Sequence, residues 1–133
     1  MDSAPKLSRG SIHSIMVLGE RPQNSILQIT LIKEMASKTS HKKYRIQLSD
    51  GEYYTAAILS SQLNSKIESG DIKLYTVVIL SEFNLTPTLD KQLLIAINVE
   101  PILPFPSIIG NPKNIISISQ ENSQTLNIQS QNQ

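Results

Sequence analysis

The chain of 133 residues contains no cysteine, no tryptophan and only two histidines. Without cysteine there is no disulfide framework and no thiolate metal site. His13 and His41 lie far apart, and no motif with a catalytic mechanism accompanies them. We therefore expect no enzyme activity, no metal and no cofactor. No apolar run approaches the roughly 18 residues of a membrane-spanning helix, and none follows the N-terminal charges, so we expect neither a membrane protein nor a signal peptide.

One segment alternates strictly between apolar and polar residues. Its apolar positions are Tyr44, Ile46 and Leu48, and its polar positions are Lys43, Arg45 and Gln47. Because side chains on a strand change face at every residue, residues 43–49 are predicted to form a strand with one buried face and one basic face. Asp50-Gly51 then supplies a turn.

The net charge of the chain is only +1, so any attraction for an acidic partner must be local. Residues 33–45 hold such a concentration of charge. It consists of Lys33, Lys38, Lys42, Lys43 and Arg45 against Glu34 alone. A basic row on a small sheet is typical of a surface that meets a phosphate backbone or an acidic protein segment.

The remaining pattern predicts a mainly β protein. A helix capped by Ser8 should occupy about 8–18, strands 26–33, 43–49 and 53–59, a second helix 60–69, and two further strands 72–83 and 91–99. Turns are expected at 86–90 and at Pro101 and Pro104. Five strands with a helix between the third and fourth indicate a five-stranded Greek-key OB-fold barrel, preceded here by a short N-terminal helix.

The last predicted strand has apolar residues on both faces. Leu94 and Ala96 should fill the barrel, which leaves Leu93, Ile95 and Ile97 outside. Exposed apolar residues mark binding sites unless another segment covers them, and the first helix and the proline-rich segment after residue 100 are two such candidates. An apolar floor beside a basic rim suits an acidic amphipathic helix lying in a groove.

Five short motifs occur in order along the chain. They are Leu7-Ser8-Arg9-Gly10-Ser11-Ile12, Ile26-Leu27-Gln28-Ile29, Lys43-Tyr44-Arg45 with Ser49-Asp50-Gly51, Ser61-Gln62-Leu63-Asn64, and Ile109-Gly110-Asn111-Pro112. Together they resemble the N-terminal domain of the large subunit of replication protein A, the eukaryotic single-stranded DNA-binding complex. The resemblance implies a flexible N-terminus at 1–6, an OB-fold protein-interaction domain at 7–112, and a disordered linker at 113–133 that leads to further domains.

The resemblance also implies a function in the nucleus, in DNA replication, repair, recombination and the damage checkpoint. Such a domain recruits acidic helical segments of checkpoint and repair proteins and touches single-stranded DNA weakly, while other regions join the subunits of a heterotrimer. The basic rim carried over from the family is Lys33, Lys43, Arg45 and Lys91. The apolar floor carried over is Met35, Ala56, Ile58, Leu85, Leu93 and Ile95. The family often has Arg at the positions of these three lysines. Because Lys cannot form the bidentate pair that Arg makes with a carboxylate, carboxylates should bind less tightly here.

The tail beyond residue 112 is rich in Ser, Gln and Asn, a composition typical of a linker. Ser119, Ser123 and Ser130 each precede Gln, which is the preference of DNA-damage checkpoint kinases. Phosphates at these candidate sites would compete with an acidic partner for the basic domain, although a glutamine-rich tail also produces such pairs by composition alone.

A different interpretation makes single-stranded DNA the main ligand, as in a telomere-specific paralogue of the same large subunit. OB-folds of that kind stack bases on aromatic side chains. This chain has four Tyr and two Phe, and Tyr44 is expected in the core. We therefore expect DNA binding by this domain to be weak and dependent on salt.

Overall fold

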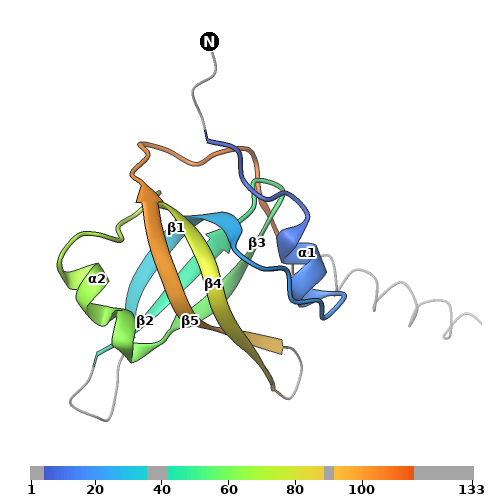
Figure 1. Ribbon diagram of the computed structural model, residues 1–133, viewed down its shortest axis with the longest axis horizontal. Helices are drawn as coiled ribbons and strands as arrows, with labels where there is room; N and C mark the ends of the chain where they lie inside the picture. Colours follow the sequence, from blue (N-terminus) through green and yellow to red (C-terminus); the bar gives the residue numbers. More distant parts are fainter. Residues whose placement is uncertain (1–4, 36–41, 89–91, 116–133) are drawn as a thin grey trace, which may run out of the picture.

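A computed structural model describes residues 5–35, 42–88 and 92–115 (Figure 1). Its elements, in chain order, are α1 (Ser11–Met16), β1 (Ser25–Met35), β2 (Lys43–Ser49), β3 (Tyr53–Leu59), the 3-10 helix η1 (Ser61–Leu63), α2 (Asn64–Glu68), β4 (Val77–Pro87), β5 (Gln92–Leu103) and β6 (Lys113–Asn114). No helix among these residues is long and apolar enough to cross a bilayer.

The strands close into a five-stranded barrel. Each strand pairs with the next in the circular order β1, β2, β3, β5, β4 and back to β1, and only β3 and β5 run parallel. The mainly β OB-fold expected from the sequence is therefore confirmed. β1 closes the circle because residues 25–28 pair with β4 and residues from Gln28 onward pair with β2, so that Gln28 has both neighbours. The pairing with β2 contains a register shift between Ile29 and Leu31.

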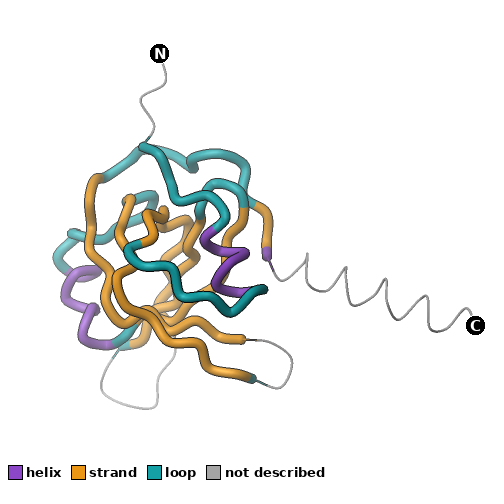
Figure 2. Tube along the Cα trace, turned by 45° about the vertical axis from the view of Figure 1, so that its right-hand side comes forward, coloured by secondary structure: helices purple, strands orange, loops and turns teal. Residues whose placement is uncertain are grey.

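The alternation of residue type decides which face is buried. Ile46, Ala57 and Leu94 are paired across β2, β3 and β5, and all three are 0% exposed. The two helices lie on different sides of this core (Figure 1), and Figure 2 shows the strands between them. From α1, Ile12 and Ile15 enter the core completely. The predicted inward positions of the second and last strands are thus confirmed.

The prediction for the first helix is wrong at its start. Ser8 does not cap α1, because its hydroxyl accepts a hydrogen bond from the Ile26 N–H (2.8 Å) and holds the chain against β1. The helix begins at Ser11, after Gly10 in a left-handed conformation. The Asp50 carboxylate, distant in sequence, accepts hydrogen bonds from the Gly10 and Ile12 N–H groups and satisfies this end of the helix instead.

The fourth and fifth strands also differ from their predicted bounds. Residues 72–76 form a turn, in which Tyr75 has a φ of 72° and the Lys73 N–H donates to the Thr76 hydroxyl, so β4 begins only at Val77. β5 continues through Pro101 to Leu103. A proline fits there because, within the part of the chain that the structure describes, β5 pairs with β3 at residues 94–96 and Pro101 pairs with β4 alone.

The folded part extends past the boundary expected at residue 112. Lys113 and Asn114 form β6, which pairs in parallel with Tyr53 and Tyr54 of β3, and Ile115 is 1% exposed within the core. No local sequence pattern predicts this strand. Residues 36–41, between β1 and β2, and the tail from 116 onward lie outside the described residues. The turn expected at 86–90 is wrong at its start, because Thr86 and Pro87 belong to β4, and residues 89 and 90 lie outside the described residues.

Candidate functional site

The backbone register brings four of the predicted site residues into one row. Lys33 of β1 pairs with Arg45 of β2, Arg45 with Ile58 of β3, and Ile58 with Ile95 of β5. Because paired residues share a face of the sheet, these side chains lie side by side on the outside of the barrel. Lys33 and Arg45 are exposed, and Ile58 and Ile95 are half-buried. The row therefore changes from cationic to apolar within four strands.

Four more predicted residues lie on the same face, two positions along their strands from members of this row. Lys43 pairs with Met35, whereas Ala56 and Leu93 stand beside Ile58 and Ile95 at the spacing that returns a strand to the same face. We call the set the outer-face patch. Its members are Lys33, Met35, Lys43, Arg45, Ala56, Ile58, Leu93 and Ile95.

Leu85, predicted for the apolar floor, does not join this patch. It pairs with Leu94, which is fully buried, and it packs against the core from the inner face. Register shifts in β4 between Leu80 and Phe83 set the phase of the strand, and the sequence pattern does not reveal them. Lys91 of the basic rim and the candidate phosphosites Ser119, Ser123 and Ser130 lie outside the described residues.

Polar residues outside the predicted site surround the patch. Asn84 of β4 pairs with Ile95 and extends the row on its apolar side. Asn64 donates a hydrogen bond from its amide to the Lys42 carbonyl (2.7 Å), which fixes the backbone immediately before Lys43. Gln62 donates to the Ile97 carbonyl (2.8 Å) in the same way. Two side chains from η1 and α2 thus hold the edges of the patch in place.

The outer-face patch combines exposed cations with aliphatic side chains. Within the described part of the chain, the side chains of Lys33, Lys43 and Arg45 have no carboxylate partner, so their charges face the solvent. In that same part, no group of three His, Asp or Glu residues is placed to hold a metal ion. None of the eight members is aromatic. Two aromatic side chains of neighbouring strands, Tyr44 and Phe83, are buried in the core instead (7% and 6% exposed). Cations beside aliphatic side chains suit carboxylates attached to an apolar segment.

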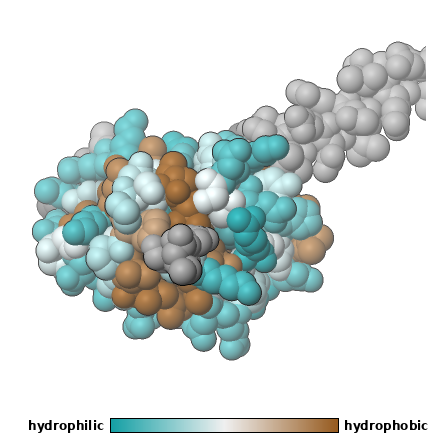
Figure 3. All heavy atoms as spheres, turned by 90° about the horizontal axis from the view of Figure 1, so that it is seen from above, coloured by the Kyte–Doolittle hydropathy of each residue, from teal (hydrophilic) through white to brown (hydrophobic). Residues whose placement is uncertain are grey.

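A second apolar surface lies at another end of the barrel. Its exposed residues are Leu74, Ile102, Leu103 and Ile108 (38–47% exposed). The buried Gln28 side chain ties these segments together, since it donates to the carbonyls of Tyr75 and Ser107 and accepts from the Ile109 N–H. Figure 3 looks onto the molecule from above and shows apolar residues gathered among polar ones. The described residues place no basic row beside this surface.

Sequence comparison decides the family. The profile of the family described as "Replication factor-A protein 1, N-terminal domain" matches residues 7–104, which include β1 to β5 and every described member of the outer-face patch. The chain belongs to this family. The resemblance seen in the sequence motifs is confirmed, and the chain is an N-terminal domain of a replication protein A large subunit.

Individual relatives agree with the family assignment. The chain is 30% identical to one of the replication protein A 70 kDa DNA-binding subunits of Arabidopsis thaliana over 83% of its own length, and 30% identical to replication factor A protein 1 of Schizosaccharomyces pombe over 91%. It is 40% identical over 58% of its length to the replication protein A 70 kDa DNA-binding subunit of Drosophila melanogaster. It spans only 13–22% of the length of these three relatives.

Proposed function

We propose that this domain is a recruitment module that binds acidic amphipathic segments of checkpoint, repair and replication proteins. The observation that supports the proposal is the row of Lys33, Arg45, Ile58 and Ile95, which presents charge and apolar surface side by side. An amphipathic helix with carboxylates along one edge of its apolar face matches such a surface. Residues 7–115 form the module in this proposal, and the residues that follow are a linker to the rest of the polypeptide.

The binding free energy has two terms. Lys33, Lys43 and Arg45 attract and orient the acidic segment, and this term weakens as salt screens it over a Debye length of about 8 Å at physiological ionic strength. Met35, Ile58, Leu93 and Ile95 then bury the apolar face of the segment, at about 25 cal/mol per Å² of apolar area less the cost of ordering the peptide. Affinity should therefore decrease with salt without vanishing.

The wider role follows from the family and is part of the same proposal. The relatives are named as DNA-binding subunits or replication factors, which suggests work on DNA in the nucleus by a non-enzymatic protein. Other regions of a longer polypeptide would bind the remaining subunits of the complex. The second candidate function is single-stranded DNA binding as the main task of this domain, and the names of the relatives favour it.

A titration of the chain followed by NMR separates the two functions. Recruitment predicts that a synthetic acidic amphipathic peptide shifts the amide resonances of Lys43, Arg45, Leu93 and Ile95 at physiological salt. An oligonucleotide should bind only at low salt. Tight binding of the oligonucleotide at physiological salt, with no response to the peptide, would show that recruitment is the wrong function.

Two charge-reversal variants sharpen the test. Arg45→Glu should abolish peptide binding and leave the circular dichroism spectrum unchanged, because the side chain is exposed. Lys73→Glu makes the same change in charge in the turn before β4. This turn is hydrogen-bonded to Ile29 in the first half of β1, whereas Lys33 lies in the second half, so the variant should bind the peptide normally. If the Arg45→Glu protein binds as well as the Lys73→Glu protein, the peptide does not use the outer-face patch.

A further inference from the structure

The segment between β5 and β6 is rich in proline and carries no charge. Residues 101–112 hold four of the seven prolines of the chain and no Asp, Glu, Lys or Arg. In Figure 1 this segment leaves the tip of β5 and crosses one end of the barrel. Leu103 is eight residues beyond Ile95, which along an extended strand corresponds to about 26 Å. The segment is therefore separate from the outer-face patch.

Proline restricts the backbone of this segment. The ring of proline holds φ near about −65°, and a residue that precedes proline is confined to extended or polyproline conformations. The first rule fixes Pro104 and Pro106, and the second fixes Leu103 and Phe105. In the structure, Pro104 and Phe105 belong to no helix, strand or turn. Four consecutive residues thus have little conformational freedom to lose when they bind a partner.

Hydrogen bonds hold both ends of these four residues. Before them, Leu103 pairs with Val77 of β4. After them, the buried Gln28 side chain donates to the Ser107 carbonyl (2.8 Å) and accepts from the Ile109 N–H (2.9 Å). The proline-rich segment is therefore presented in one position on the barrel.

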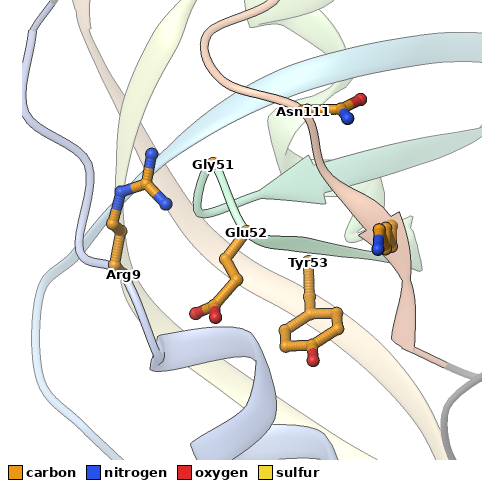
Figure 4. Close-up of a pocket in the computed structure, with 6 residues that line it drawn as sticks. Arg9, Gly51, Glu52, Tyr53 and Asn111 are labelled. Carbon is orange, nitrogen blue, oxygen red and sulfur yellow. The ribbon is translucent and has the colours of Figure 1, made fainter.

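Close packing fixes the chain further along. A Cβ atom at Gly110 would lie 2.6 Å from the Gly51 carbonyl oxygen, so the chain there lies directly on the turn between β2 and β3. Figure 4 shows Asn111 on this part of the chain and Gly51 on the turn, and both residues line a small polar pocket. The segment is thus anchored at β4, at Gln28 and at this turn.

Between its anchors the segment displays apolar surface. Pro104 and Pro106 are exposed, and Ile102 and Ile108 on either side of them are 47% and 46% exposed. Within the part of the chain that the structure describes, no hydrogen bond engages the backbone of residues 104–106. Their carbonyl oxygens can therefore accept hydrogen bonds from a partner that covers the apolar side chains.

The neighbouring turn adds one cation. The Gln28 amide that donates to Ser107 also donates to the Tyr75 carbonyl (3.1 Å), so the turn before β4 is held beside the proline-rich segment. Leu74 of this turn is 47% exposed, and Lys73 is exposed and has no carboxylate partner among the described residues. A partner that covers the segment would meet the Lys73 charge at its edge.

We propose that residues 103–106 are a docking site for a domain that binds proline-rich segments in an aromatic-lined groove, with a carboxylate at the edge of the groove for Lys73. Such grooves bind preformed polyproline conformations, which lose little entropy on binding. With a single cation beside it, the segment offers little to a nucleic acid or to an acidic peptide. The partner therefore differs from those of the outer-face patch, and both could bind together.

The test titrates the isotope-labelled full chain with purified WW, SH3 and EVH1 domains, one at a time, and follows the amide resonances by NMR. These three classes of domain bind proline-rich segments in aromatic-lined grooves. A domain that uses this site should shift the amides of Leu103, Phe105 and Ser107 and leave the amide of Arg45 unmoved. A synthetic peptide of residues 101–108 should compete for the same domain, but more weakly than the chain, because the free peptide is not held in place.

Paired variants decide which residues the domain contacts. In Pro104→Ala with Pro106→Ala, the affinity for the domain should fall at least about tenfold, as expected when anchors of an interface are truncated. The matched control, Pro22→Ala with Pro87→Ala, removes two prolines elsewhere and should bind normally. The acidic amphipathic peptide should bind both double variants with unchanged affinity, which shows that both are folded.

A charge variant tests the edge of the groove. Lys73→Gln should weaken binding of the domain and make it less dependent on salt, whereas Lys113→Gln at β6 should do neither. Three results would overturn the site: no response to any of the three classes of domain, equal affinities of the two double variants, or self-association of the chain through residues 102–108 in analytical ultracentrifugation. Each of them leaves recruitment by the outer-face patch intact.

Discussion

Asp50 offers the sharpest test of how the fold is held together. Its carboxylate makes four hydrogen bonds to backbone N–H groups while fully buried. In Asp50→Asn one of the two oxygens becomes an NH2 group. Whichever way the amide turns, this group faces two N–H donors and can accept from neither. The substitution keeps the shape of the side chain and removes half of its acceptors.

The size of the effect follows from those two lost hydrogen bonds. Bonds to a charged group contribute about 1.5–3 kcal/mol each, which gives about 3–6 kcal/mol for the pair. Because the neutral amide avoids the burial of a charge, the lower end, about 3 kcal/mol, is expected. A domain of this size has about 5–15 kcal/mol of stability, so the variant should still fold. Its melting temperature should fall by about 12 °C.

Urea unfolding followed by far-ultraviolet circular dichroism measures the loss. The control is Asp71→Asn, which makes the same chemical change at an exposed carboxylate before β4 and should cost less than about 0.5 kcal/mol. If Asp50→Asn lost less than about 1 kcal/mol relative to this control, the carboxylate would not be the group that joins α1 to the turn. In that case the amide of Ile12 should also keep its protection from hydrogen exchange.

Three further substitutions test other parts of the structure. Ile46→Asp puts a charge at a 0% exposed core position and should prevent folding, and a dispersed NMR spectrum would show that the inner and outer faces of β2 are reversed. Gln28→Leu removes all three hydrogen bonds to the segments around Tyr75 and Ser107, so the free energy of unfolding should fall by about 2 kcal/mol. That end of the barrel should also become sensitive to limited proteolysis, and unchanged cleavage would contradict this. Gly110→Ala forces an alanine to adopt a φ of 76° and brings its Cβ into a clash with Gly51, so urea unfolding should show a loss of about 1–2 kcal/mol in the free energy of unfolding. Equal stability would mean that the two turns separate easily.

The sequence was sufficient where the structural signal is local. β2 and β3 begin and end at the residues predicted, because strict alternation and the Asp50-Gly51 turn depend on neighbouring positions. The helical segment expected at 60–69 also follows from local spacing, although it divides into η1 and α2 and ends at Glu68, just before Gly70 with its φ of 86°. The start of β4 was misplaced because residues 72–76 are rich in strand formers, yet hydrogen bonds to a distant residue of β1 hold them in a turn.

Most of the candidate site also came from sequence. The resemblance to the family supplied the residues, and alternation correctly placed Arg45 outside and Leu94 inside. Leu85 came from the resemblance alone, and the structure places it opposite Leu94 on the inner face, where the register shifts in β4 set the phase of the strand. A small polar pocket lined by Arg9, Glu52 and Lys113 has no counterpart in any local pattern, because its walls are separated by more than half of the chain.

The amino-acid sequence by itself determined that this protein is mainly β, that it has a basic outer strand, and which family it belongs to. These properties depend on residue type and on spacing within a few positions. Only the tertiary structure decided that Lys33, Arg45, Ile58 and Ile95 form one row, and that Asp50 rather than Ser8 caps the first helix. The physical reason is that register and barrel closure are set by hydrogen bonds between distant residues, which local preference does not encode.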